Sequence, residues 1–358
     1  MKIIYCNGDM DNGKDEAQDK LRAAGHEVIY YNITENERRE NLWTIRHFQM
    51  YEEILDMAEN ADVLYFTCPI NCPEVFLYNL KTRPNFKAKV ISSMMFREVN
   101  RSLARAMSIK DLIDMPQFGL MVFSSMLPDS PKLPTNLEKV GIDRNKIMLI
   151  SEPYNEDPQL FKEITRKVAR NIFNIKQDEK VLLNSGSWNY IRGADLFAEA
   201  VKYIDPDIKI LLHKNRSTHT DPTLHEGLIE KAKKNHPNTI VIEAWIPRGQ
   251  MAYFYIASDV VLCSHRKLYE YSVSGIPNMA ALAKKPIVAP DFYYFNEIVN
   301  RFKTGILYEP ENIEDMVKAI HHCFVNYEYM VERAEFEKSL ANYIEATDRP
   351  LEILKRLK

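Results

Sequence analysis

The sequence has little of several features that mark specialised classes of protein. Its 358 residues include five cysteines, an odd number spread over the chain, which argues against a disulfide framework and favours a reducing compartment. No apolar run approaches the roughly 18–20 residues that a membrane-spanning helix needs. The start of the chain reads as a strand followed directly by polar residues, and so does not predict a signal peptide. We therefore expect a cytoplasmic protein without a transmembrane segment.

A strong net charge and two common nucleotide-binding motifs are also absent. The formal net charge of −3 gives no global electrostatic reason to bind nucleic acid or an anionic membrane, although a local basic face stays open. The sequence contains no Gly-x-x-x-x-Gly-Lys-Ser/Thr motif, which argues against a P-loop nucleotide hydrolase. It has no Gly-x-Gly-x-x-Gly after a strand, which argues against a dinucleotide-dependent dehydrogenase.

The composition that is present suits two folded domains. Apolar residues make up 46% and charged residues 27% of the chain, which is typical of a soluble globular protein. A length of 358 residues is too great for one ordinary small domain. Short apolar runs alternate with helical periodicity from end to end, as in a parallel sheet with crossover helices. The sequence therefore predicts an α/β protein with two Rossmann-like domains that face each other across a cleft.

The predicted elements form two groups on either side of a connector. The first group has strands at 2–6, 27–32, 63–68, 89–94, 120–124 and 146–150, and helices at about 14–24, 41–60 and 102–113. The connector, 151–161, contains Pro153 and Pro158 and leads into a helix expected over 160–173. The second group has strands at 180–184, 208–213, 239–243, 260–263, 286–289 and 305–308, and helices at 193–204, 224–235, 248–257 and 278–284. Residues 313–358 are expected to be mostly helical.

Glycines and polar residues follow the first strand of the second group. The strand breaks at Asn184 into a loop with Gly186 and Ser187, and a helix begins after Arg192 and Gly193. Free N–H groups and the helix dipole make such a strand end and helix start an anion site. Arg192 is a candidate clamp for a diphosphate, because a fixed cation beside free amides binds phosphate oxygens. An exposed first-turn arginine is an equally good interpretation.

A second candidate segment, 264–270, follows a strand apolar enough to be central. Its potentially cationic side chains are those of His265, Arg266 and Lys267. Such a loop at the carboxyl end of a central strand indicates an anionic ligand, and Glu270 would accept hydrogen bonds from sugar or ribose hydroxyls. Further on, Ser274 and Gly275 would let the backbone approach a phosphate closely. The alternative is a solvated surface loop.

Two more candidates end neighbouring strands of the second group. Lys214 follows strand 208–213 at the same predicted edge and is a candidate second phosphate contact. His213, beside it, is more often a hydrogen-bonded edge histidine than a catalyst. Trp245 follows strand 239–243 and is a candidate wall for a nucleotide base, with simple packing as the equal alternative.

In the first half, the candidates belong to an acceptor side. Gly8 and Asp9 follow the first strand, and Arg97 follows the strand at 89–94, with Arg101 close behind it. Asp9-x-Asp11 superficially resembles the metal-chelating Asp-x-Asp of some sugar transferases, but helix capping explains it as well, and we predict no metal. Cys68 and Cys72 have no matching Cys or His pair and are expected to pack rather than to bind zinc.

In this order the features resemble the GT-B glycosyltransferases, and most of all the large retaining group that includes bacterial cell-surface mannosyl- and glucosyltransferases. The similarity is clearest over residues 146–320. Residues 147–161 are similar to the family's interdomain strand and Pro-Asn-Gly-Val-Asp…Phe connector, 186–197 to Gly-Arg-Leu…Lys-Gly-x-Asp-Leu-Leu, 241–260 to the segment lining the base pocket, 280–289 to Ala-Met-Ala-x-Gly-x-Pro-Val-Val-Ala, and 296–308 to Glu-Ile-Val…Gly-x-Leu-Val. The N-terminal half resembles the family in architecture only.

The sequence departs from the family's pattern at its nucleotide grip. The family's first diphosphate-binding arginine falls on Ser187, which leaves Arg192, at the family's lysine position, as the surviving cation. Met279 stands where the second, ribose-binding glutamate of Glu-x7-Glu is expected. Glu270 matches the first glutamate only with a shift of one residue. Lys214, Arg266 or Lys267 are candidates to compensate.

The resemblance implies a metal-independent, retaining hexosyltransferase that uses a nucleoside diphosphate sugar as co-substrate and no cofactor. Uridine is the favoured base from the frequency of donors in the family. Arg192, with Lys214 or Lys267, would hold the diphosphate beside Gly186 and Ser187. Glu270 and the backbone of Ser274 and Gly275 would orient the sugar or its phosphates, and Trp245 would line the base pocket. The acceptor, on the side of Gly8, Asp9 and Arg97, is a glycan, lipid, protein or nucleic acid, and contact with a membrane surface is left open.

The resemblance also gives domain bounds and leaves two alternatives. Residues 1–155 would form the acceptor domain, 156–335 the donor domain, and 336–358 a helical segment packing back on the first domain. The altered arginine and glutamate positions favour, as a first alternative, a catalytically degenerate transferase fold that binds a sugar or a partner. The second is a nucleotide-sugar epimerase, which needs a carboxylate cluster that the sequence does not supply beyond Asp9 and Glu270.

Overall fold

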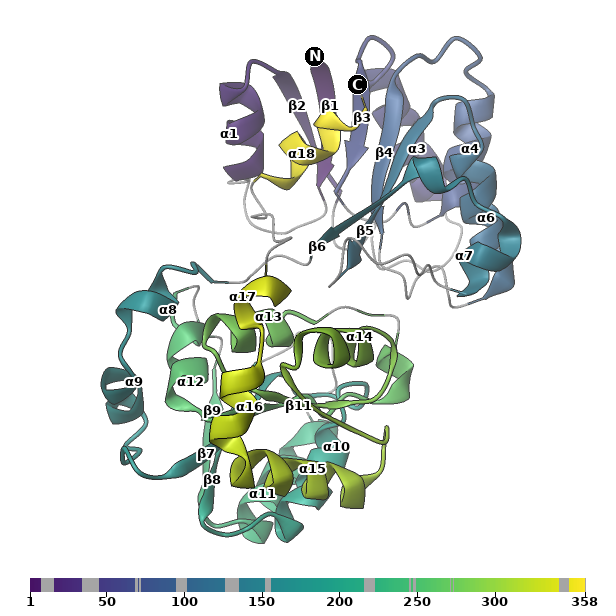
Figure 1. Cartoon of the computed structure of the whole chain (residues 1–358). Coiled ribbons are helices and arrows are strands. Elements are labelled where there is room, and N and C mark those ends of the chain that lie inside the picture. The colour runs from purple at the N-terminus through teal and green to yellow at the C-terminus, as the bar shows by residue number, and fades with distance from the viewer. Residues whose placement is uncertain are drawn as a thin grey trace. The chain divides into compact units, whose positions relative to one another are not determined.

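The computed structural model describes most of the chain as two compact α/β units (Figure 1). It describes all residues except 8–15, 34–44, 68–69, 71, 95–101, 126–134, 152–155, 216–222, 245, 247–248, 271, 273, 341–347 and 358. Unit 1 comprises Met1–Glu152, Tyr271–Val273 and Tyr343–Lys358, and unit 2 comprises Pro153–Glu270 and Ser274–Asn342.

Unit 1 is built on a six-stranded parallel sheet with the order β2-β1-β3-β4-β5-β6. The strands are β1 (Lys2–Asn7), β2 (Glu27–Asn32), β3 (Val63–Phe66), β4 (Lys89–Met94), β5 (Phe118–Ser125) and β6 (Ile147–Ser151). The helices are α1 (Glu16–Ala23), α3 (Ile45–Met57), α4 (Pro73–Lys81), α6 (Leu103–Ile113), α7 (Thr135–Val140), the short η1 (Arg144–Lys146) and, from the end of the chain, α18 (Arg349–Lys355). The central strands β1 and β3 are mostly apolar and buried, because helices cover both faces of a parallel sheet.

The C-terminal helix α18 completes the core of unit 1. Ile353 and Leu354 are buried against side chains of β1, β3 and β5. Lys20 of α1 forms an ion pair with Asp348 at the start of α18, with an Nζ–Oδ1 distance of 2.6 Å. Figure 1 shows the two helices beside each other. The chain thus returns to the sheet in which it began.

Unit 2 carries the second six-stranded parallel sheet, with the order β12-β11-β10-β7-β8-β9. Its strands are β7 (Lys180–Ser187), β8 (Ile208–Asn215), β9 (Thr239–Glu243), β10 (Val260–Leu262), β11 (Ile287–Pro290) and β12 (Gly305–Tyr308). Its helices are α8 (Leu160–Glu163), α9 (Arg166–Ile172), α10 (Ala194–Ala200), η2 (Val201–Tyr203), α11 (Thr223–Asn235), α12 (Met251–Ala257), η3 (Lys267–Tyr269), α13 (Ile276–Leu282), α14 (Tyr293–Phe302), α15 (Ile313–Val325), α16 (Tyr327–Arg333) and α17 (Phe336–Ser339).

The order of strands in unit 2 decides where polar groups gather. β7 and β10 are neighbours at the centre, with Val260 paired to Leu182 and Leu262 to Asn184. Because the strands are parallel, their carboxyl ends meet at one edge, and α10 and α13 begin there. The prediction of an α/β protein with parallel sheets in both halves is confirmed. No described helix is long and apolar enough to cross a membrane.

Several helix predictions were wrong in detail. The helix expected over 160–173 is divided into α8 and α9, because Ile164 is extended (φ −78°, ψ 119°) and the Thr165 side chain caps α9 by accepting from the Val168 N–H. Helices α4, α7 and α14 were not predicted. α14 follows Phe292, an N-cap residue whose side chain makes no capping hydrogen bond, and its first residue, Tyr293, has a φ of +30°. A sequence signal for its start is therefore missing.

Candidate functional site

A pocket opens at the carboxyl edge of the sheet in unit 2. It is lined by the ends of β7 and β10 and by the starts of α10 and α13. The lining residues are Asn184, Ser185, Gly186, Trp188, Arg192, Ala194, Leu262, Ser264, His265 and Ile276. Gly186 and Arg192, both predicted from the sequence, therefore share one pocket.

Arg192 is held in this pocket by aromatic side chains. Its Nη2 donates to the Tyr269 hydroxyl at 3.2 Å, and its guanidinium carbon lies 5.1 Å from the centroid of the Tyr269 ring. Its Nη1 lies 3.5 Å from His265 Nε2. A Cβ at Gly186 would stand 3.4 Å from the same Nη1. A glycine at 186 therefore leaves open the space in front of the cation.

The start of α10 is locked onto the end of β10. Gly193 has a φ of +69°, and a Cβ there would lie 1.9 Å from the Ser264 carbonyl oxygen. The Ser264 hydroxyl donates to the Arg192 carbonyl at 2.9 Å and accepts from Asn184 Nδ2 at 3.2 Å. Only glycine fits this close approach at a positive φ. The backbone that carries Arg192 is thereby fixed to the central strands.

His265 is a neutral partner of Arg192. Its side chain is 1% exposed and packs against the rings of Tyr269 and Phe295. Burial, and after it the charge of Arg192, lowers the pKa of His265 well below its ordinary value. Because Nε2 faces a guanidinium that can only donate, the proton of the neutral ring belongs on Nδ1. Arg192 is thus the charged side chain among the described residues that line the pocket.

The depressed pKa of His265 predicts a loss of stability in acid. The unfolded imidazole takes up a proton below its ordinary pKa of 6.5, whereas the folded one does not, so the free energy of unfolding falls as pH drops below about 6.5, by up to about 1.4 kcal/mol per pH unit for each such histidine. His213, whose pKa burial also lowers, adds to this. Chemical denaturation between pH 7 and 5 measures the slope. His265→Gln should reduce it, while the exposed His322→Gln should not; equal slopes in all three proteins would contradict the assignment.

The prediction that the loop after β10 presents three cationic side chains to a ligand was wrong for two of the three. His265 is buried and neutral. Arg266 pairs with Asp195 and, at 3.2 Å, with Glu311, and stacks on the Tyr190 ring at 4.1 Å. Its charge is therefore already compensated. Lys267 is exposed on η3.

The remaining candidates of this segment lie beside the lining of the pocket. Glu270 follows η3 and is partly exposed. Gly275 is the N-cap of α13, and Ser274 Oγ accepts from the Ile276 N–H at 3.3 Å. Ser274 and Gly275 thus stand at a helix start whose first residue lines the pocket. Lys267 and Glu270 are not among the lining residues that the structure describes.

Lys214 lies at the same edge, one strand away from the pocket. It is paired in register with Gly186 of β7, and its Nζ lies 3.2 Å from Glu243 Oε2. His213 is 2% exposed and is held by Ser185 Oγ at 3.1 Å and the Ala244 carbonyl at 3.2 Å. His213 is thus a hydrogen-bonded histidine at the edge of the sheet, a role that we expected from the sequence to be more frequent than that of a catalytic histidine.

Other predicted site residues lie outside what the structure describes. Trp245, Gly8, Asp9 and Arg97 are not described, and Ser187 is described by its backbone alone, at the end of β7. Sequence reasoning missed Tyr269 and the neutral state of His265. The sequence signal for Tyr269 is its position four residues after His265. The short helix η3 turns Tyr269 towards Arg192. No group of three or more His, Cys, Asp or Glu side chains suited to a metal occurs among the described residues.

Comparisons with known proteins agree with this architecture. Residues 165–340 match the family described as Glycosyl transferases group 1. The whole chain is similar in structure to sucrose-phosphate synthase from Thermosynechococcus elongatus (TM-score 0.72, 15% identity, 99% of this chain and 98% of that one). It is also similar to a glycosyltransferase from Rickettsia africae (TM-score 0.71, 16%, 99% and 98%) and to Anabaena HepE in complex with UDP (TM-score 0.72, 12%, 100% and 99%).

The identities to these structures are 10–16%. At this level the similarity shows the fold and not the details of the site. A search of curated protein sequences finds no match to the chain. The two parallel six-stranded sheets, the pocket at the carboxyl edge of the second and the family match all agree with the resemblance predicted from the sequence. Through residues 165–340 the chain belongs to the glycosyl transferases group 1, and it is a glycosyltransferase of the GT-B fold.

Proposed function

We propose that the chain transfers a sugar from a nucleoside diphosphate sugar, with UDP as the nucleotide, to an acceptor hydroxyl. The observation that carries this proposal is the Arg192 guanidinium in a pocket beside Gly186 and a buried neutral histidine. As the glycosidic bond breaks, the leaving diphosphate gains negative charge. A fixed cation then binds it more strongly than in the ground state, which lowers the barrier.

The donor is supported by what similar structures bind. Anabaena HepE is described in complex with UDP and with UDP-glucose, and an Escherichia coli protein is described with UDP-2-fluoro glucose. In this chain the diphosphate would lie between Arg192 and the backbone at Gly186 and at the start of α13. Lys214 would reach it by exchanging Glu243 for a phosphate oxygen.

Glu270, Lys267 and Trp245 stay candidates for orienting the sugar, the phosphates and the base. The backbone of Ser274 and Gly275 adds N–H groups at the start of α13, where an anion gains from the open end of the helix. The acceptor would bind on the side of Gly8, Asp9 and Arg97. Among the described residues, Cys263 and Cys323 are buried and in no disulfide, which is in keeping with the reducing conditions of the cytoplasm.

The reaction is proposed to retain the anomeric configuration and to need no metal. Both properties follow from the resemblance to the retaining group. They are tested together by NMR spectroscopy of the product formed in the presence of a chelator. An inverted anomeric centre, or a rate that requires an added divalent cation, would refute the corresponding part.

A thermal-shift screen tests the choice of donor. Uridine, guanosine and adenosine diphosphate sugars are compared, and the cognate donor should raise the stability by about 2.7 kcal/mol at one hundred times its Kd. We expect the largest shift with a uridine nucleotide and a smaller one in the Arg192→Ala variant. A larger shift with guanosine or adenosine donors would overturn the choice of UDP, and no shift with any of them would overturn the donor pocket.

A second candidate function is a degenerate transferase fold that binds a sugar nucleotide without turnover. It is favoured by Met279, which is 3% exposed in α13 at the position where the resemblance expects a glutamate. A buried thioether cannot accept hydrogen bonds from a ribose as a carboxylate does. Calorimetric titration with the donor, joined to an assay of sugar release, separates the two. Binding without release favours the second candidate.

A further inference from the structure

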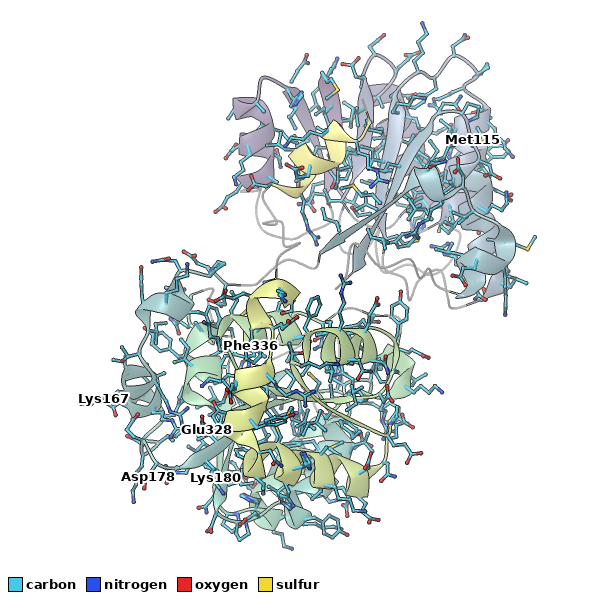
Figure 2. The ribbon with its side chains drawn as sticks, in the orientation of Figure 1. Met115, Lys167, Asp178, Lys180, Glu328 and Phe336 are labelled. Carbon is cyan, nitrogen blue, oxygen red and sulfur yellow. The ribbon has the colours of Figure 1, made fainter. Side chains whose placement is uncertain are left out.

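Four charged side chains gather at the amino edge of the sheet in unit 2. Asp259 directly precedes β10, and Lys285 stands two residues before β11; Arg166 and Arg170 lie one turn apart on α9. Because the strands are parallel, this edge is opposite the pocket of Arg192. Figure 2 labels Lys167, the neighbour of Arg166 on α9, together with Lys180 at the first position of β7 and Glu328 of α16.

Arg170 has a structural role in which every nitrogen of its guanidinium donates a hydrogen bond. It is fully buried. Its guanidinium donates to the carbonyls of Ala257 (3.1 Å), Lys176 (2.7 Å), Gln177 (2.9 Å) and Glu179 (2.9 Å) and to Asp259 Oδ2 (2.9 Å). These bonds tie the turn before β7 to the end of α12. Because it is also fully buried, Arg170 is assigned to the structure and not to a ligand site.

Asp259 is equally occupied. Its Oδ2 accepts from Arg170 and from the Val181 N–H at 2.8 Å, and its Oδ1 lies 2.6 Å from Arg166 Nη2. One carboxylate thus serves two guanidinium groups. It neutralises one of the positive charges at this edge.

Lys285 is the side chain that this arrangement leaves over. It is 8% exposed, and within the part of the chain that the structure describes its ammonium makes no hydrogen bond or ion pair. Burial is the main cause that lowers the pKa of Lys285 to about 8; Arg166 and Arg170 lower it further, while Asp259 raises it. An ammonium largely withdrawn from water and without a partner is costly, which favours either the loss of its proton or the binding of an anion.

Two more donors face the same place. Arg166 has a side chain 38% exposed, so part of its guanidinium is open to solvent beyond the bond to Asp259. Tyr327, at the start of α16, interacts electrostatically with Asp259 and Arg166, and burial raises its pKa to about 12. Its hydroxyl therefore stays protonated. With Lys285 protonated, the charges of Arg166, Arg170, Lys285 and Asp259 sum to +2. This charge would balance that of a phosphate dianion.

We propose that Lys285 and Arg166 form a binding site for a phosphate group, as inorganic phosphate or as a small phosphate monoester, separate from the nucleotide pocket. The ammonium and the guanidinium each bind phosphate oxygens well. Neither residue lines the pocket of Arg192. The site therefore does not depend on the transfer reaction, and it would bind phosphate independently of the nucleotide pocket.

The test is a calorimetric titration of the full chain at pH 7 with inorganic phosphate in one arm and phenyl phosphate in the other. Arg192→Ala is the background, because it removes the contribution of the nucleotide pocket. In that background, binding should persist in at least one arm. Lys285→Met should then weaken it at least about tenfold, because a neutral side chain of similar length replaces the ammonium. Binding of inorganic phosphate but not of phenyl phosphate would identify the free ion as the ligand. Binding of both would indicate a site that is open to solvent and accepts monoesters.

Two controls keep the proposal falsifiable. Lys284→Met removes a neighbouring lysine whose side chain is 65% exposed and paired with Glu337, and it should leave the affinity unchanged. Should Lys285→Met not fold, the partly exposed Arg166→Gln replaces it, again with an expected loss of about tenfold or more. Phosphate binding that is absent in the Arg192→Ala background, or equal in the Lys284 and Lys285 variants, would overturn the site.

Discussion

Replacing Arg192 by alanine is expected to lower the rate constant for sugar transfer by about 10²–10³-fold. This is the usual effect of removing one fixed donor from the place where charge develops in a transition state. The structure makes a large value reasonable, because Tyr269 and Ser264 fix the side chain and backbone of Arg192 before any ligand binds. A preorganised cation needs no rearrangement at the moment when the diphosphate leaves. The measurement is the initial rate of nucleoside diphosphate release at saturating donor.

Three variants show whether the loss is specific. Arg192→Lys keeps the charge but not the fork that grips two oxygens, so an intermediate rate is expected. Tyr269→Phe keeps the ring and removes the hydroxyl that accepts from Nη2, so the cation is less well fixed, and kcat should fall, but by less than in Arg192→Ala. Arg333→Ala, on the exposed surface of α16, is the matched control and should leave the rate as it is. A rate for Arg192→Ala equal to that of Arg333→Ala would remove Arg192 from the reaction.

The strands could be predicted from the sequence better than the helices. The bounds of β2, β4, β9 and β12 are those predicted, because a short apolar run is a strong signal for a strand. α14 was not predicted because its N-cap, Phe292, and its first three residues, Tyr293 to Phe295, are all aromatic and resemble a strand. The division of 160–173 depends on one extended residue, Ile164, whose conformation no local pattern specifies.

The candidate site could be predicted in its position but not in its charges. The order of strand, glycine and helix start was enough to find Gly186 and Arg192, because every parallel sheet brings those features to one edge. The charge state of the 264–270 segment could not be predicted in this way, because it depends on partners distant in the chain. Arg266 is compensated by Asp195, 71 residues away, and burial between aromatic rings keeps His265 neutral.

The largest expected effect on folding is that of Gly193→Ala. A Cβ at this position would stand 1.9 Å from the Ser264 carbonyl oxygen and 2.9 Å from its carbon, so backbone has to move. The φ of +69° adds strain of about 1–3 kcal/mol for any residue with a side chain, and overpacking adds about 1–3 kcal/mol. We expect the free energy of unfolding of unit 2 to fall by about 2–6 kcal/mol.

Gly227→Ala in α11 is the matched control for this glycine. No heavy atom lies within 4 Å of its virtual Cβ, and it is exposed, so alanine there should raise stability by about 0.5–1 kcal/mol through its higher helix propensity. Chemical denaturation followed by circular dichroism gives both values. Variants of equal stability would mean that α10 and β10 do not approach as closely as described. Because the Arg192 carbonyl bonds to Ser264, any Gly193→Ala protein that folds should also bind the donor more weakly, which links the packing of the central strands to the grip on the diphosphate.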